Sequence, residues 1–126
     1  MIDHVGLNVS ELAAAKAFYA ETLEPLGYRV WAEWEDEHVV GFAADESGPD
    51  FWIYTRGDEP SAPTHVSFRA RDRETVDAFH AAGLAAGGSD NGAPGVRPHY
   101  HEQYYGAFVL DHDGNNIEAV CHSAGS

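Results

Sequence analysis

Two features are scarce in this chain, and each scarcity excludes a class of protein. Its one cysteine, Cys121, cannot form a disulfide within the chain, which excludes a disulfide-stabilised fold and favours a reducing compartment. No apolar run approaches the ~20 residues that a membrane-spanning helix needs. The N-terminus also has no basic stretch followed by an apolar one. We therefore expect a cytoplasmic protein with no membrane partner.

Basic residues are scarce as well. Seven Lys and Arg stand against 21 Asp and Glu, for a formal net charge of −14. Such a surface repels phosphate backbones, so we expect no nucleic-acid partner. If the chain binds a small molecule, an acidic surface favours a cationic one. Histidine, by contrast, is plentiful: the eight histidines are scattered along the chain, so each is weighed separately.

The chain repeats itself within what we interpret as one domain, with repeats at about 1–57 and 62–122. Residues 3–28 align with 64–89 at an offset of 61, which pairs His4 with His65. Residues 41–54 align with 107–120 at an offset of 66. Two segments that match in the same order indicate a duplicated unit.

Each repeat predicts the element order β-α-β-β-β from its hydrophobic periodicity and turn residues. Ser10 is the expected N-cap of the first helix, which ends around Pro25 and Gly27, and Asp72 is the expected N-cap of the second. The glycine-rich stretch 85–95 is interpreted as a loop. The expected strands are 5–9, 29–34, 39–44, 51–55, 65–70, 105–110 and 116–121.

Strand alternation places a polar set on the sheet faces that turn away from the helices. If both sheets curve the same way, those faces line one groove, and four equivalent positions point into it: His4, Trp52, His65 and Glu118. Two imidazoles and a carboxylate with open positions suit one divalent ion of Fe, Mn, Zn, Ni or Co. A metal would also compensate the charge of Glu118 within an apolar strand.

A simpler interpretation stays open for each of these residues. A histidine on a strand is more often a surface or hydrogen-bonded residue than a ligand. Glu118 has Arg69 or Arg97 as alternative partners.

Three segments stand out in the chain: DHVGLNV (3–9), THVSFRA (64–70) and, most specifically, GAFVLDHDGNNIEAV (106–120). Together they resemble the vicinal oxygen chelate superfamily, which includes glyoxalase I, bleomycin-resistance proteins, fosfomycin-resistance transferases and extradiol dioxygenases. The resemblance covers essentially the whole chain.

The resemblance implies an α+β fold of two tandem βαβββ modules, whose curved mixed sheets form a half-barrel, and a homodimer. It implies metal ligands at His4, His65 and Glu118. The fourth family position falls on Trp52, so the resemblance does not extend to the glutamate base of glyoxalase I. The remaining three ligands resemble the dioxygenase and transferase arrangements, whereas the bleomycin-resistance branch sequesters a ligand without metal.

Further candidates lie just before the strand 105–110 and in the first repeat. We expect His101 and Tyr104 to act in catalysis, and we expect four residues to contact a small-molecule ligand: Trp52, Tyr54, His99 and Tyr105. A packed aromatic loop is the alternative for the residues before that strand.

Two functions are therefore predicted. The first is a divalent-metal-dependent enzyme acting on a small oxygen-bearing substrate, with lyase, isomerase, transferase and dioxygenase chemistry all left open. The second is a metal-free protein that binds an antibiotic-like small molecule and confers resistance.

Overall fold

The computed structural model describes residues 1–57, 59–61 and 63–123, and it has the two-module architecture that the repeats predict. The first module contains β1 (Val5–Asn8), α1 (Leu12–Thr22), β2 (Arg29–Trp34), β3 (Val39–Ala43) and β4 (Phe51–Tyr54). The second contains β5 (His65–Arg69), α2 (Arg73–Ala85), β6 (Ser89–Val96), β7 (Tyr105–Leu110) and β8 (Asn116–Cys121).

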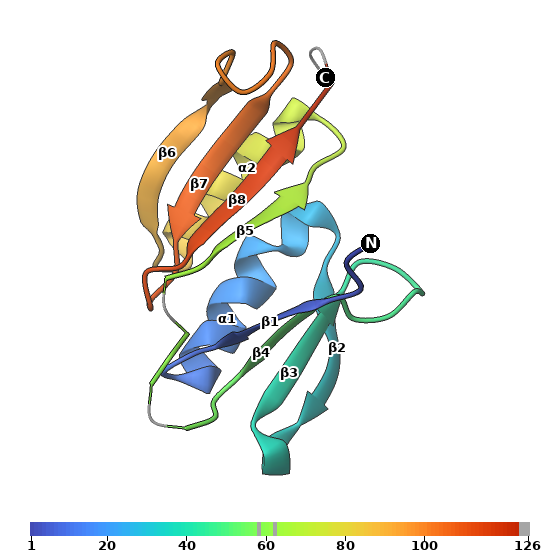
Figure 1. Ribbon diagram of the computed structural model, residues 1–126, viewed down its shortest axis with the longest axis vertical. Helices are drawn as coiled ribbons and strands as arrows, with labels where there is room; N and C mark the ends of the chain where they lie inside the picture. The colour runs from blue at the N-terminus through green and yellow to red at the C-terminus, as the bar shows by residue number, and fades with distance from the viewer. Residues whose placement is uncertain (58, 62, 124–126) are drawn as a thin grey trace.

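Each module forms its own four-stranded mixed sheet. The strand order is β1-β4-β3-β2 in the first sheet and β5-β8-β7-β6 in the second, with one parallel pair in each, β1 with β4 and β5 with β8. The sheets lie side by side, with β5 next to the first module (Figure 1). They do not close into a barrel.

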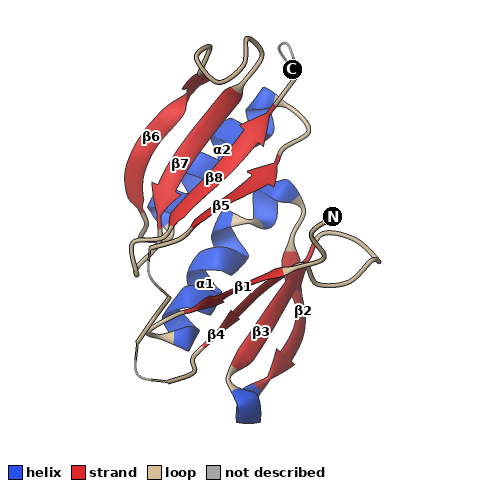
Figure 2. Cartoon of the chain, in the orientation of Figure 1, coloured by secondary structure: helices blue, strands red, loops and turns tan. Residues whose placement is uncertain are grey.

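The helices pack on one side of the sheets and bury one face each. In α1 the buried residues are Ala15, Phe18, Tyr19 and Thr22, the spacing of a single helical stripe. In α2, Gly83 allows close packing, because a Cβ there would lie 3.0 Å from Val109 of β7. We call the opposite side of each sheet, turned away from the helices, the open face (Figure 2).

Two local expectations were wrong. The stretch 85–95, expected as a loop, contains most of β6, which pairs with β7 through register shifts near Gly92 and Gly95. The N-cap of α1 is Glu11 rather than Ser10, and the backbone N–H of Ser10 instead donates to Asp113, 3.1 Å away. The cap of α2 is confirmed: Asp72 accepts from the N–H of Thr75 at 2.8 Å.

The turn between β7 and β8 holds the second module against the first through hydrogen bonds. Asp111 is buried and accepts hydrogen bonds from the Tyr19 hydroxyl of α1, from the backbone of Asp113 and Asn115, and from the side chain of Asn115. Burial, followed by the charge of Asp111, raises the pKa of Tyr19 far above its ordinary value. No helix of the described residues has the length and apolar character of a membrane span.

Candidate functional site

Glu118 is the centre of a polar cluster on the second sheet. It projects from the open face of β8, opposite Ser67 of β5 and Phe108 of β7, and only 1% of its surface is exposed. A buried carboxylate requires hydrogen-bonding partners, because desolvation of the charge is costly. The structure identifies these partners within the chain.

Both carboxylate oxygens of Glu118 are occupied. Nε2 of His65 lies 2.7 Å from Oε1 and donates to it, and the hydroxyl of Tyr104 donates to Oε2. Gly106 makes room for this arrangement, since a Cβ there would lie 3.2 Å from Oε2 of Glu118 and 3.1 Å from the Tyr104 ring. Burial and the bond to Glu118 raise the pKa of Tyr104, so its hydroxyl stays protonated as a donor.

The three predicted metal donors do not all meet. His65 and Glu118 are in contact, whereas His4, which precedes β1 on the other sheet, places Nδ1 2.6 Å from Oδ1 of the neighbouring Asp3. Among residues 1–57, 59–61 and 63–123, no group of three or more His, Cys, Asp or Glu side chains is arranged to hold a metal ion. Since a protein metal centre of this kind needs at least three donors around one point, the described residues of one chain do not provide it.

His4 nevertheless lies where the two modules meet. A pocket of about 430 Å³ runs between the start of β1 and β5, and both His4 and His65 line it. Its wall also includes Tyr28, Phe51, Phe68 and Arg69. We call this space the inter-sheet pocket.

The first sheet carries an aromatic pocket on its open face. Trp34 and Trp52 stack with ring centroids 5.5 Å apart and an interplanar angle of 8°. The Trp52 ring lies flat across β3 because residue 41 is glycine, where a Cβ would come within 2.6 Å of the ring. Likewise the Tyr54 ring lies over Gly6, where a Cβ would be 2.8 Å away.

These rings wall a pocket of about 380 Å³ that we call the tryptophan pocket. Its lining residues are His4, Gly6, Trp34, Glu37, Val39, Trp52, Tyr54 and Arg56. The guanidinium of Arg56 sits 4.8 Å from the centre of the Tyr54 ring. The two predicted ligand-contacting residues of β4, Trp52 and Tyr54, therefore lie together in one pocket.

The remaining predicted residues, Tyr105, His99 and His101, do not lie in either pocket. Tyr105 lies on the helix side, where its hydroxyl donates to Asp77 of α2 at 2.6 Å. This follows from strand alternation, because its neighbour Tyr104 points to Glu118. His99 and His101 are exposed in the turn before β7. The His99 ring lies 4.1 Å from that of Tyr100, and Nδ1 of His101 accepts from the backbone of Gln103.

Sequence reasoning missed two residues of the open faces: Trp34 completes the stack with Trp52, and Phe108 lies beside Glu118. Arg97, named as a possible partner of Glu118, instead covers the Phe108 ring with its Cζ 5.5 Å from the ring centre. Alternation along β7 contained a signal for Phe108, because it is two residues from Gly106 and pairs with Glu118. Nothing in the sequence indicated that the guanidinium of Arg97 lies back along β6.

Comparison with known proteins agrees with this architecture. The family model described as the Glyoxalase/Bleomycin resistance protein/Dioxygenase superfamily matches residues 1–119. A glyoxalase/bleomycin resistance protein from Albidiferax ferrireducens T118 is 32% identical, with a TM-score of 0.80 over 94% of this chain and 97% of that one. No curated protein matches the chain.

More distant structures share the fold. A glyoxalase-related enzyme from Fulvimarina pelagi has a TM-score of 0.74 at 18% identity, over 100% of this chain and 95% of that one. TioX from Micromonospora sp. ML1 has a TM-score of 0.73 at 14% identity, over 98% of this chain and 99% of that one. At these identities the likeness concerns the fold alone.

Proposed function

Because this chain belongs to the glyoxalase/bleomycin resistance protein/dioxygenase superfamily, we propose that it binds a planar small organic molecule on its open faces without a metal ion. The stacked pair Trp34 and Trp52 over Gly41 is the observation that carries the proposal. Aromatic rings held flat on a glycine backbone, beside a pocket of about 380 Å³, form a surface on which a planar ligand can stack.

The Glu118 cluster supports the metal-free form of this function. Its carboxylate already has two donors in the chain, His65 and Tyr104, so its burial does not depend on a cation.

Tryptophan fluorescence tests the proposal directly, because two of the three tryptophans line the pocket. Purified protein is titrated with a panel of planar bicyclic compounds that are cationic, neutral and anionic. We expect at least one to quench the emission saturably, and we expect Trp52→Leu to weaken its binding by up to about tenfold, which corresponds to the loss of one stacking contact.

Trp31→Leu is the matched control, since Trp31 does not line the pocket and its ring contacts Arg29 instead. Its removal is expected to leave affinity unchanged. Unchanged emission across the whole panel, together with no heat of binding in calorimetry, would refute the proposal.

A metal-dependent enzyme is the second candidate function, and the contact between His65 and Glu118 favours it. An imidazole nitrogen and a carboxylate oxygen 2.7 Å apart offer two donors to a divalent ion. A third donor would have to come from elsewhere, and a homodimer, in which a second copy brings its own histidine to this face, is the arrangement we would expect. Elemental analysis of protein purified without chelator decides between the candidates: a stoichiometric metal that His65→Ala abolishes would favour the enzyme.

A further inference from the structure

Few of the basic residues of this acidic protein form ion pairs. Lys16 pairs with Glu33 and Arg71 with Asp72, away from the open faces. In the part of the chain that the structure describes, no ion pair includes the other five, which are Arg29, Arg56, Arg69, Arg73 and Arg97. Among these five, Arg97 has its guanidinium fixed on the open face by a backbone hydrogen bond, with N–H groups left for a ligand.

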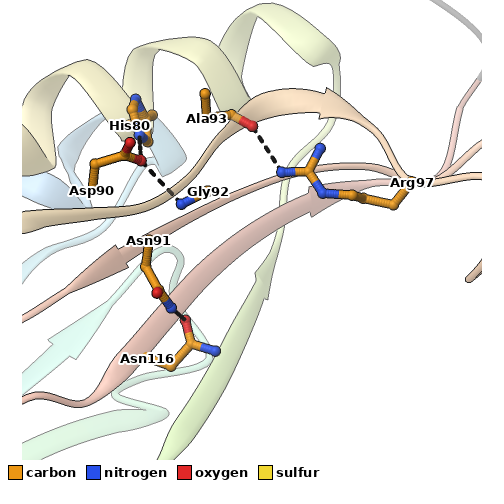
Figure 3. Close-up of polar contacts among 7 residues, drawn as sticks. All are labelled: His80, Asp90, Asn91, Gly92, Ala93, Arg97 and Asn116. Carbon is orange, nitrogen blue, oxygen red and sulfur yellow. Dashed lines mark hydrogen bonds and ion pairs between the residues drawn. The ribbon is translucent and has the colours of Figure 1, made fainter.

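Arg97 is held in one position above the second sheet. Its Nη2 donates to the carbonyl oxygen of Ala93 at 2.8 Å, so the side chain lies back along β6 (Figure 3). Two glycines of β6 leave space for it: a Cβ at Gly95 would lie 3.0 Å from Nη1, and one at Gly92 would lie 3.3 Å from Nη2. A guanidinium fixed in this way loses little further freedom when it binds a partner.

Phe108 forms the floor beside this guanidinium. The ring is partly exposed and is flanked by Arg97 on one side and His65 on the other, with the imidazole centre 6.2 Å from the ring centre. The charge of Arg97 also reaches Tyr104, where it opposes the rise in the pKa of that hydroxyl. The guanidinium thus lies over the Phe108 ring at the Glu118 end of the open face.

The negative charge of Glu118 is not presented to a ligand. Its carboxylate is buried beneath His65 and Tyr104, which donate to its two oxygens. The guanidinium of Arg97 keeps donors beyond the one used on Ala93, because arginine has five N–H groups.

From this geometry we propose that Arg97 and Phe108 form a subsite for an organic anion, namely a carboxylate attached to a planar ring. The carboxylate accepts from the free N–H groups of Arg97, and the attached ring packs beside Phe108, whose face Arg97 covers. The inference rests on the proposed binding function and deepens it by assigning the charge of the ligand. It also reverses the expectation from net charge, because the surface as a whole is acidic while this part of the open face presents an arginine.

Three naphthalene probes of equal ring size test the assignment: 2-naphthoate, neutral 2-naphthamide and cationic 2-naphthylmethylammonium. Dissociation constants are measured by saturation-transfer NMR with wild type, Arg97→Gln, Arg97→Lys and Arg71→Gln. We expect naphthoate to bind wild type about tenfold tighter than naphthamide, which is the lower range for one hydrogen bond to a charged group. The advantage is expected to shrink as salt is raised.

The variants test whether Arg97 causes the tighter binding of naphthoate. Arg97→Gln is expected to remove the advantage of naphthoate over naphthamide. Arg97→Lys is expected to keep part of the advantage, because it retains the charge without the planar fork. Arg71→Gln is the control: Arg71 is exposed and lies just before the N-cap of α2, and the variant is expected to bind naphthoate like wild type. Circular dichroism confirms that each variant is folded.

The remaining outcomes distinguish a failure of the anion subsite from a failure of the proposed binding function. Equal binding of all three probes, tighter binding of the ammonium probe, or a naphthoate advantage that survives in Arg97→Gln would overturn the anion subsite while leaving planar-ligand binding intact. Failure of all three probes to bind wild type would remove the proposed function and this inference together.

Discussion

The two sheets share one backbone plan and differ in how their open faces are filled. The turn before the last strand shows the shared plan. Asp45 and Asp111 each accept from the N–H two residues further on, at 2.8 and 2.9 Å, and each turn has a glycine with positive φ, Gly48 at 98° and Gly114 at 86°. Only the second aspartate is buried, because Tyr19 covers it.

The two open faces carry their aromatic ring on different strands. In the first sheet Trp52 of β4 lies over its cross-strand partner Gly41. In the second sheet Glu118 of β8, the counterpart of Trp52, faces Phe108 of β7, so the ring is on the other strand. The counterpart of Gly41 in the aligned repeat is Ala107, which pairs with Ala119, so the pairing of the last two strands is shifted by one residue between the modules. The comparison shows that one sheet of a duplicated fold can become an aromatic surface while the other becomes a polar cluster.

The largest predicted effect concerns the two turns. Asp111→Ala is expected to lower the free energy of unfolding by about 3 kcal/mol, because the buried Tyr19 hydroxyl and the N–H of Asn115 lose their acceptor. Asp45→Ala, in the exposed turn, is expected to change it far less. Urea denaturation measures both, and similar losses in the two variants would show that burial does not distinguish the turns.

A smaller loss is expected at the polar cluster of the second sheet. Tyr104→Phe leaves Oε2 of the buried Glu118 without its donor and is expected to cost about 2 kcal/mol. Tyr100→Phe is the control, because Tyr100 is exposed and only its ring approaches Tyr104. A stability for Tyr104→Phe equal to that of the control would mean that water replaces the hydroxyl without cost.

Alkaline pH is expected to destabilise the protein through its buried tyrosines. A pKa raised in the folded state stabilises the fold fully below the unfolded value of about 10, and that contribution is lost as pH rises above it. Tyr19 has this property, so wild type is expected to lose more stability between pH 9 and 11, on the order of 1 kcal/mol, than Tyr19→Phe does. Thermal melts across that range check it. Some alkaline sensitivity is expected to remain in the variant from Tyr28, Tyr104 and Tyr105, whose pKa values are also raised.

The smallest stability effect is expected in the aromatic surface of the first sheet. Trp34 is about half exposed, so Trp34→Leu is expected to change the free energy of unfolding by less than about 0.5 kcal/mol. Near-ultraviolet circular dichroism should nevertheless change strongly, because the stacked pair is lost. A large stability loss with an unchanged spectrum would contradict the stacked arrangement.

Much of the fold followed from periodicity. Both helices, the repeated element order and the last two strands were predicted, because their apolar residues recur at helical or strand spacing. The strand β6 was not predicted. Its glycines and Pro94 are typical of a loop, and this stretch is a strand because it pairs with β7.

The site was only partly predictable for a related reason. Alternation correctly put His65 and Glu118 on one face, because the alternation of side chains along each strand is a local property. The donor to Glu118 was expected to be a metal, Arg69 or Arg97, whereas Tyr104 was assigned to catalysis and not to this bond. How a turn folds over a sheet depends on its packing, which strand periodicity does not encode. The position of His4 relative to His65 depends on how two sheets pack, which is equally remote from the sequence pattern.

The hydrogen bonds between the modules at the turn between β7 and β8 have a consequence for unfolding. Ser10 and Tyr19, both from the first module, are hydrogen-bonded to Asp113 and Asp111 of the second. If either module opened alone, the buried hydroxyl of Tyr19 or the buried carboxylate of Asp111 would lose its hydrogen-bond partner in the other module. We therefore expect the duplicated halves to unfold as one cooperative unit, even though their strands belong to separate sheets.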